Sequence, residues 1–179
     1  MKIYKFFDWD PKTDQEYDLS GREYNDLIEV CFKYSSVMSF TSCGADIELL
    51  QIIEKYHISR PDNIKINNSI YGYGDFTDKQ IGLNFYRLCP NLMDVLLSHT
   101  NGIFEWIHGW GFNNPENPVF YRENGSIFFS SLIHEGEITL TVNDGEDVSK
   151  ITMINGWKKV SDFSNHGYNV NERESSCKI

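Results

Sequence analysis

The stretch 118–142, PVFYRENGSIFFSSLIHEGEITLTV, decides the fold because it contains three apolar runs separated by two turn signals. Asn124-Gly125 separates the first two runs, and this pair favours a two-residue hairpin because both residues accept positive φ. Glu135-Gly136 separates the second run from the third. In the third run apolar and polar residues alternate, which places one face on a core and the other in water. We predict an antiparallel meander with strands at 118–122, 126–133 and 137–142.

Apolar spacing on both sides of the meander predicts the remaining elements. The predicted strands are at 2–7, 63–66 and 79–88. The predicted helices are four: one over 22–34, one that Ser42 caps and that runs through Tyr56, one from Pro90 that closes at Asn101-Gly102, and one over 147–160. The expected fold class is α+β, with a mainly antiparallel sheet packed against two to four helices. We expect a single domain over 1–160 and a polar, loosely ordered tail over 161–179.

The composition excludes several classes of protein. The chain has 179 residues, a net charge of −10 and 15% aromatic residues. A chain this aromatic can bury enough apolar surface to offset its ordering entropy, so an intrinsically disordered protein is excluded. Nucleic acid and acidic membrane surfaces are disfavoured as main ligands, because proteins bind both through Lys and Arg.

No segment predicts export or membrane insertion. Lys5 interrupts the apolar start of the chain and Asp8 ends it, so this region does not match a secretory signal. No apolar run approaches the ~20 residues of a membrane span. None of the four cysteines forms a Cys-x-x-Cys pair, and we expect free thiols. The expected compartment is the cytoplasm.

The residues that could carry catalysis or hold a cofactor show no recognisable pattern. The five histidines are scattered, without the spacing of a zinc-binding helix. The glycine-containing run 71–74 lacks the third glycine of a dinucleotide-binding loop. We therefore expect no metal, no cofactor and a non-catalytic protein. The enzyme alternative is a hydrolase that uses Cys89 or Ser130 with a histidine, with His108 or His134 as the partner of the cysteine.

The negative charge is concentrated in the block 88–149. This block has nine acidic residues and one basic residue, Arg122. Eight aromatic residues fall within 104–129, among those acids. Aromatic residues inside a polar rim are typical of protein interfaces, and a basic partner would be attracted to this surface. The alternative interpretation is that the acidic block is only a solvated face.

The candidate partner-binding residues are ten side chains of this block: Glu105, Trp106, Trp110, Glu116, Glu123, Glu135, Glu137, Asp144, Glu146 and Asp147. A further alternative is a nucleic-acid-binding domain, whose basic face would be formed by Lys150, Lys158, Lys159 and Arg173.

The chain resembles the immunity proteins of bacterial polymorphic-toxin and contact-dependent growth inhibition systems. The resemblance is one of type, and the segments 110–112, 118–125 and 134–137 have the character of the strands and turns of those proteins. It implies that the protein binds and neutralises a cognate toxin domain, often a basic nuclease. In that case the candidate acids would face the toxin's Lys and Arg, with Trp106 and Trp110 as anchors.

Overall fold

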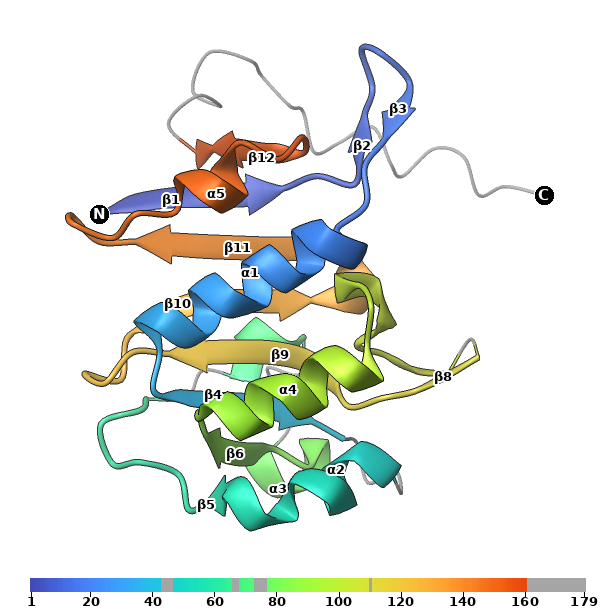
Figure 1. Cartoon of the computed structure of the whole chain (residues 1–179). Helices are drawn as coiled ribbons and strands as arrows, with labels where there is room; N and C mark the ends of the chain where they lie inside the picture. The colour runs from blue at the N-terminus through green and yellow to red at the C-terminus, as the bar shows by residue number, and fades with distance from the viewer. Residues whose placement is uncertain (43–46, 66–67, 73–76, 110, 161–179) are drawn as a thin grey trace.

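A large antiparallel sheet forms the centre of the molecule in the computed structural model (Figure 1). The structure describes residues 1–42, 47–65, 68–72, 77–109 and 111–160. Within them, eight strands follow the order β12-β1-β11-β10-β9-β4-β6-β5, and all neighbouring strands are antiparallel. One main sheet with helices packed on it confirms the predicted α+β class.

The predicted meander forms the middle of this sheet. Strands β9 (Glu116–Tyr121), β10 (Ile127–Leu132) and β11 (Glu137–Val142) are neighbours in the sheet, as expected. Gly125 and Gly136 have positive φ in the two connections, at 81° and 66°. A register shift between β9 and β10 lies at Phe128, and both Phe128 and Phe129 are fully buried. The bulge therefore lets two consecutive rings enter one core.

Strands from both ends of the chain extend the meander. β1 lies between β11 and the edge strand β12, so the N-terminal strand is paired on both sides. On the other side, β4 joins β9 to β6, and β5 forms the second edge. The added strands are β1 (Lys2–Phe6), β4 (Val37–Thr41), β5 (His57–Ile58), β6 (Asn84–Arg87) and β12 (Trp157–Lys159). Two hairpins stand apart from the main sheet: β2 (Trp9–Asp10) pairs with β3 (Gln15–Glu16), and β7 (His108–Gly109) pairs with β8 (Phe112–Asn113).

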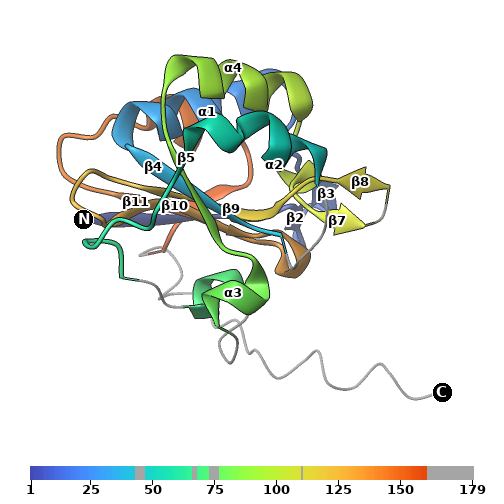
Figure 2. The ribbon, with the colours of Figure 1, turned by 90° about the horizontal axis from the view of Figure 1, so that it is seen from below.

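Three helices cover one face of the sheet (Figure 2). They are α1 (Gly21–Tyr34), α2 (Glu48–Ile53) and α4 (Pro90–His99). α1 and α4 contribute Leu27, Cys31 and Leu96 to a core that also contains Phe40 and Phe120 of the sheet, all with 0% exposure. The four-residue helix α5 (Ser149–Thr152) packs on α1. The described residues also form 3₁₀ turns, which are η1 (Glu54–Tyr56), η2 (Asn68–Tyr71), η3 (Ile103–Glu105) and η4 (Ile133–Glu135).

The opposite face of β4, β6 and β9 carries η2 and the short helix α3 (Asp78–Ile81). A second, smaller core lies there, and it contains a buried group of hydroxyls. The Tyr71 hydroxyl lies 2.6 Å from Oγ of Ser39 and 2.5 Å from the hydroxyl of Tyr121. These contacts satisfy three buried polar groups and attach η2 to the sheet.

The predicted helix over 147–160 is wrong beyond its first turn. Helix α5 ends at Thr152, and the chain then turns and enters strand β12 at Trp157. The turn passes through Gly156 at φ 95°, which a continuing α-helix does not allow. Trp157 packs edge-on against Phe6, with 5.5 Å between ring centroids. Pairing with β1 thus overrides the helical spacing of the apolar residues.

Three further boundaries differ from those predicted. The 79–88 strand begins as helix α3 and is extended only in β6. Residues 63–65 form a turn and coil rather than a strand, and residue 66 lies outside the described residues. Ser42 does not cap the second helix, because its hydroxyl donates to the Gly82 carbonyl (3.3 Å) and α2 begins at Glu48. The intervening residues 43–46 lie outside the described ranges.

Candidate partner-binding surface

The meander separates the predicted acidic residues into two groups. Because neighbouring strands are antiparallel, Glu116 and Glu137 lie at one end of the sheet. Glu123 and Asp144 follow the far ends of β9 and β11 and lie at the opposite end. Six residues of strand separate these ends by roughly 17 Å. The acidic residues predicted to bind one partner therefore lie at two opposite ends of the sheet.

A new group of acids completes one of these ends. Asp8, in the connection between β1 and β2, lies close to the start of β11. Its Oδ2 would be 4.0 Å from a Cβ added to Gly136, the residue before β11. The β2–β3 hairpin and the β7–β8 hairpin extend beyond the same end of the sheet (Figures 1 and 2). We call this the acidic end, and its carboxylates are Asp8, Asp10, Asp14, Glu16, Asp18, Glu105, Glu116, Glu135 and Glu137.

Few cations balance these carboxylates. The segments 5–18, 103–117 and 133–138 carry nine acidic residues and two basic ones. Lys158 of the neighbouring strand β12 adds a third cation. Six of the nine acids, including Asp8 and Glu137, are exposed in the structure. The acidic end therefore combines parts of the N-terminal region and of the 88–149 block that are distant in sequence.

Two of the predicted acids have structural contacts as well. Oε2 of Glu105 accepts a hydrogen bond from the backbone N–H of Asn101 at 2.8 Å. Oε1 of Glu116 accepts one from the backbone N–H of His108 at 3.2 Å. Both side chains are partly exposed, so they hold their loops and still contribute negative charge to the acidic end.

Trp106 is not a surface anchor, contrary to the prediction. Its side chain has 0% exposure and lies 4.9 Å from Phe40, ring centroid to ring centroid. Its Nε1 donates to the Tyr24 hydroxyl at 2.9 Å, and that hydroxyl contacts Oγ1 of Thr100 at 2.6 Å. Burial raises the pKa of Tyr24 above its ordinary value. Trp110, the other predicted anchor, lies outside the described residues.

Two other aromatic residues are exposed at the acidic end. Trp9 of β2 is 44% exposed and Phe112 of β8 is 42% exposed. Nε1 of Trp9 donates to Oδ1 of Asp14 at 3.2 Å, which holds the ring on the hairpin. The sequence contained a signal for Trp9, because Asp8 and Asp10 flank it in a polar segment. Rigid exposed rings among charges are typical of binding surfaces.

Glu146 supports the opposite end of the sheet from within. Its carboxylate makes two hydrogen bonds with Arg122, at 2.6 and 2.7 Å, and accepts one from the Asn143 backbone N–H. Desolvation raises the pKa of Glu146, but the bonds from Arg122 and Asn143 and the charge of Arg122 outweigh it, so the pKa lies below its ordinary value. Only 13% of the Glu146 side chain is exposed and its carboxylate is bonded within the fold, so it offers little surface to the predicted partner.

Asp147 also has a local role. Its Oδ1 accepts hydrogen bonds from the hydroxyl and the backbone N–H of Ser149, at 2.7 and 3.0 Å. These two bonds lower the pKa of Asp147. Its backbone N–H donates to the Tyr34 hydroxyl at 2.9 Å. Asp147 thus fixes the start of α5 at the end of the sheet away from the acidic end.

A hollow of about 490 Å³ lies within the acidic end. Its apolar lining includes Phe6 and Ile138, which are at most 2% exposed and therefore form its floor. Asp8, Glu135 and Glu137 are exposed and form its rim. Lys5 and His134 also line it. We call this cavity the acidic hollow.

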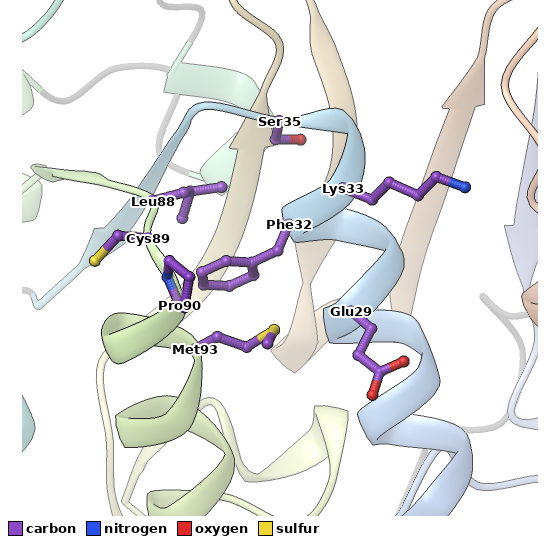
Figure 3. Close-up of a pocket in the computed structure, with 8 residues that line it drawn as sticks. All are labelled: Glu29, Phe32, Lys33, Ser35, Leu88, Cys89, Pro90 and Met93. Carbon is purple, nitrogen blue, oxygen red and sulfur yellow. The ribbon is translucent and has the colours of Figure 1, made fainter.

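The geometry around Cys89 does not match the proposed hydrolase pair. Cys89 lies in a groove of about 410 Å³ between α1 and α4, and the residues that line this groove include no histidine. Figure 3 shows the Phe32 ring facing Pro90 across the groove, while the Cys89 sulfur points away from α1. The Leu88 N–H donates to the Ser36 carbonyl, and the Ser36 N–H donates to the carbonyl of Tyr121, the last residue of β9. Cys89 therefore lies at the end of the sheet opposite His108 and His134.

The remaining nucleophile and thiol candidates have ordinary surroundings. Ser130 is half-buried in the middle of β10, between Val119 and Thr139 of the adjacent strands. Cys31 is a buried free thiol, and burial raises its pKa. Cys89 is a partly exposed free thiol.

The predicted basic group is not a free cationic face. Nζ of Lys150 makes ion pairs with Asp26 at 2.7 Å and Glu29 at 2.9 Å. Nζ of Lys158 lies 4.0 Å from Oδ2 of Asp10. Lys159 pairs with Tyr4 across β1 and β12, whereas Arg173 lies outside the described residues. Acidic neighbours reduce the attraction that two of these lysines offer to phosphates.

The described part of the chain has no group of three or more His, Cys, Asp or Glu side chains placed to hold a metal ion. None of its helices has the length and apolar character needed to cross a bilayer. Comparisons with protein-family models, curated proteins and solved structures find no significant match.

Proposed function

We propose that the protein is a non-catalytic immunity protein that binds a basic toxin domain through the acidic end. The observation that carries this proposal is the convergence of nine carboxylates from three separate segments on one end of the sheet. The resemblance in type to immunity proteins supplies the kind of partner. Binding there would cover Lys and Arg residues that a nuclease needs for its substrate.

The exposed rings support a protein partner rather than a small ion. Trp9 and Phe112 can bury apolar area at the centre of an interface, while the surrounding carboxylates supply charge complementarity. A standard interface covers about 800 Å² on each partner. The solvent-accessible surface of the chain totals 10865 Å², so under a tenth of it would be covered.

The proposal is tested by co-expression with the polypeptide encoded directly upstream of this chain. We expect that polypeptide to stop growth when expressed alone and to be neutralised, and bound in a stable complex, when this chain is present. An upstream product that is harmless, or that neither binds this chain nor is neutralised by it, would contradict the proposal.

Two charge-reversal variants locate the binding surface. The acidic-end variant carries Asp8→Lys, Glu135→Lys and Glu137→Lys, and the control carries Asp62→Lys, Glu123→Lys and Asp144→Lys at the opposite end. Both variants change the net charge equally, and all six side chains are exposed. We expect only the acidic-end variant to lose neutralisation. Equal protection by the two variants would place binding elsewhere.

A further inference from the structure

The acidic hollow is large enough to bind one side chain or a small ligand. Its volume of about 490 Å³ falls within the range of about 300–1,000 Å³ usual for ligand pockets. It is built by the end of β1, by η4 and by the start of β11, which are fixed by the sheet. The Phe6 and Phe104 rings pack against each other, with 6.4 Å between centroids. The floor is therefore formed by packed side chains rather than by a loop alone.

The chemistry of the lining favours a cation with an apolar stem. Ile133 is buried and Phe104 partly buried, so they offer apolar contacts, whereas Asp8, Glu135 and Glu137 are exposed and offer carboxylates. A long basic side chain buries its methylene groups on apolar surface and keeps its charge among polar groups. Lys5 is the one lysine or arginine in the lining, against three carboxylates, and Nε2 of His134 lies 4.0 Å from Oε1 of Glu135.

The chain already binds one of its own cations in this way at the same end of the sheet. Nζ of Lys158 lies 5.5 Å from the centroid of the Phe7 ring and 4.0 Å from Oδ2 of Asp10. A ring face and a carboxylate thus receive an ammonium group directly beside the hollow, and Phe7 also lines the hollow. This is an example within the molecule of the contact that a partner's cation would make.

We propose, on the basis of the proposed function, that the acidic hollow binds a single arginine side chain of the basic partner. The planar guanidinium donates two parallel hydrogen bonds to one carboxylate and stacks flat on aromatic rings, a fixed geometry that the compact ammonium group of lysine lacks. The hollow then fixes the register of the interface.

The first test uses a probe that carries only the side chain in question. Nα-acetyl-arginine amide is titrated into the full chain, and amide shifts are followed in ¹⁵N–¹H spectra. We expect saturable shifts confined to the segments that line the hollow, 5–8, 104 and 133–138. Nα-acetyl-citrulline amide, which has the same shape without the charge, is expected to bind at least about tenfold more weakly, the factor that corresponds to ~1.4 kcal/mol.

Matched variants control for charge and stability. Glu135→Gln with Glu137→Gln should abolish saturation by the arginine probe, whereas Glu123→Gln with Asp144→Asn at the opposite end should leave it unchanged. An equal response to citrulline, shifts outside the hollow, or no shifts at all would overturn the proposal.

The outcome can be separated from that of the proposed function. If the probe does not bind but charge reversal at the acidic end still prevents neutralisation, the arginine site is wrong and the immunity function stands. If the probe binds in the hollow and no toxic partner is found, the arginine site stands and the immunity function is wrong.

Discussion

At the scale of single residues, the Tyr24 hydroxyl links the buried indole N–H of Trp106 to the buried hydroxyl of Thr100. Thr100 donates its hydroxyl hydrogen to the Leu96 carbonyl, so Tyr24 donates to Thr100 and accepts from Trp106. A chain of hydrogen bonds therefore runs from the indole of Trp106 to α4. Removing one member leaves another buried polar group without a partner, which costs more than the bond itself.

We predict that Tyr24→Phe lowers the free energy of unfolding by roughly 1–3 kcal/mol, because the Trp106 indole N–H loses its acceptor. Urea denaturation followed by tryptophan fluorescence measures the change. Tyr17→Phe removes a hydroxyl from a half-buried ring and is expected to change stability by less than about 0.5 kcal/mol. If the free energy of unfolding falls equally in the two variants, the hydrogen bonds of Tyr24 do not contribute more to stability than the hydroxyl of Tyr17.

The Arg122–Glu146 pair gives stability a defined pH dependence. Because the folded-state pKa of Glu146 lies below its ordinary value of 4.5, the charged carboxylate stabilises the fold above that value. This contribution is lost as the pH falls through the lower, folded-state pKa. We predict that Glu146→Gln lowers the free energy of unfolding by roughly 1–3 kcal/mol at pH 7.

The difference between wild type and Glu146→Gln should decrease as the pH falls below about 4.5. Unfolding curves in urea at several pH values test this, with the exposed Glu123→Gln as control. A difference that stays constant down to acid pH would contradict a charged pair in the folded state.

Burial of single aromatic residues was the weakest point of the sequence-based prediction. Trp106 and Trp9 both lie in mixed apolar and polar segments, yet one is in the core and the other on the surface. The difference arises because the Trp106 ring meets Phe40 and Tyr24, contacts between distant parts of the chain. Local spacing contains no information on such contacts.

At the scale of elements, Gly156 controls the entry of the chain into β12. A Cβ at this position would lie 2.5 Å from Cε2 of Phe6 and 2.8 Å from the Phe7 carbonyl oxygen. The Phe7 N–H also donates to the Gly156 carbonyl at 3.0 Å. The backbone of residue 156 is thus in close contact with the end of β1.

We predict that Gly156→Ala destabilises the protein by about 2–4 kcal/mol, because it adds a steric clash to the strain of positive φ. Gly145 offers a matched control, since its φ is 90° and a Cβ there would meet nothing within 4 Å. Gly145→Ala should cost only the strain, about 1 kcal/mol. Thermal or urea unfolding compares the two, and equal losses would exclude the contact with Phe6.

Elements with strong local signals could be predicted, and those that depend on distant pairing could not. The meander, the 2–7 strand and the helix over 22–34 are correct to within a few residues, because alternation, helical spacing and turn residues agree there. The last helix failed because β1, more than 140 residues earlier, pairs with residues 157–159.

At the scale of the whole molecule, the strand topology decides where the acidic residues of the sequence lie on the surface. The block 88–149 contains most of the net negative charge, but antiparallel strands send its acids to both ends of the sheet. Only the end that also receives the β2–β3 hairpin becomes strongly acidic. Glu105, Glu116, Glu135 and Glu137 were among the partner-binding residues predicted from the sequence. The five N-terminal acids were missed because residues 1–87 hold 14 acidic and 10 basic residues, a smaller excess of acids than in the block 88–149.

The association rate with the proposed basic partner, measured as a function of salt, tests the role of the acidic end most directly. Complementary fields raise association rates from about 10⁵–10⁶ to as much as 10⁸–10⁹ M⁻¹s⁻¹ at low salt. We predict that Asp8→Lys with Glu135→Lys and Glu137→Lys slows association at least about tenfold and flattens its salt dependence. The opposite-end control, with the same net charge, should stay within about twofold of wild type. If both variants slow association equally, only net charge matters and the acidic end is not the binding surface.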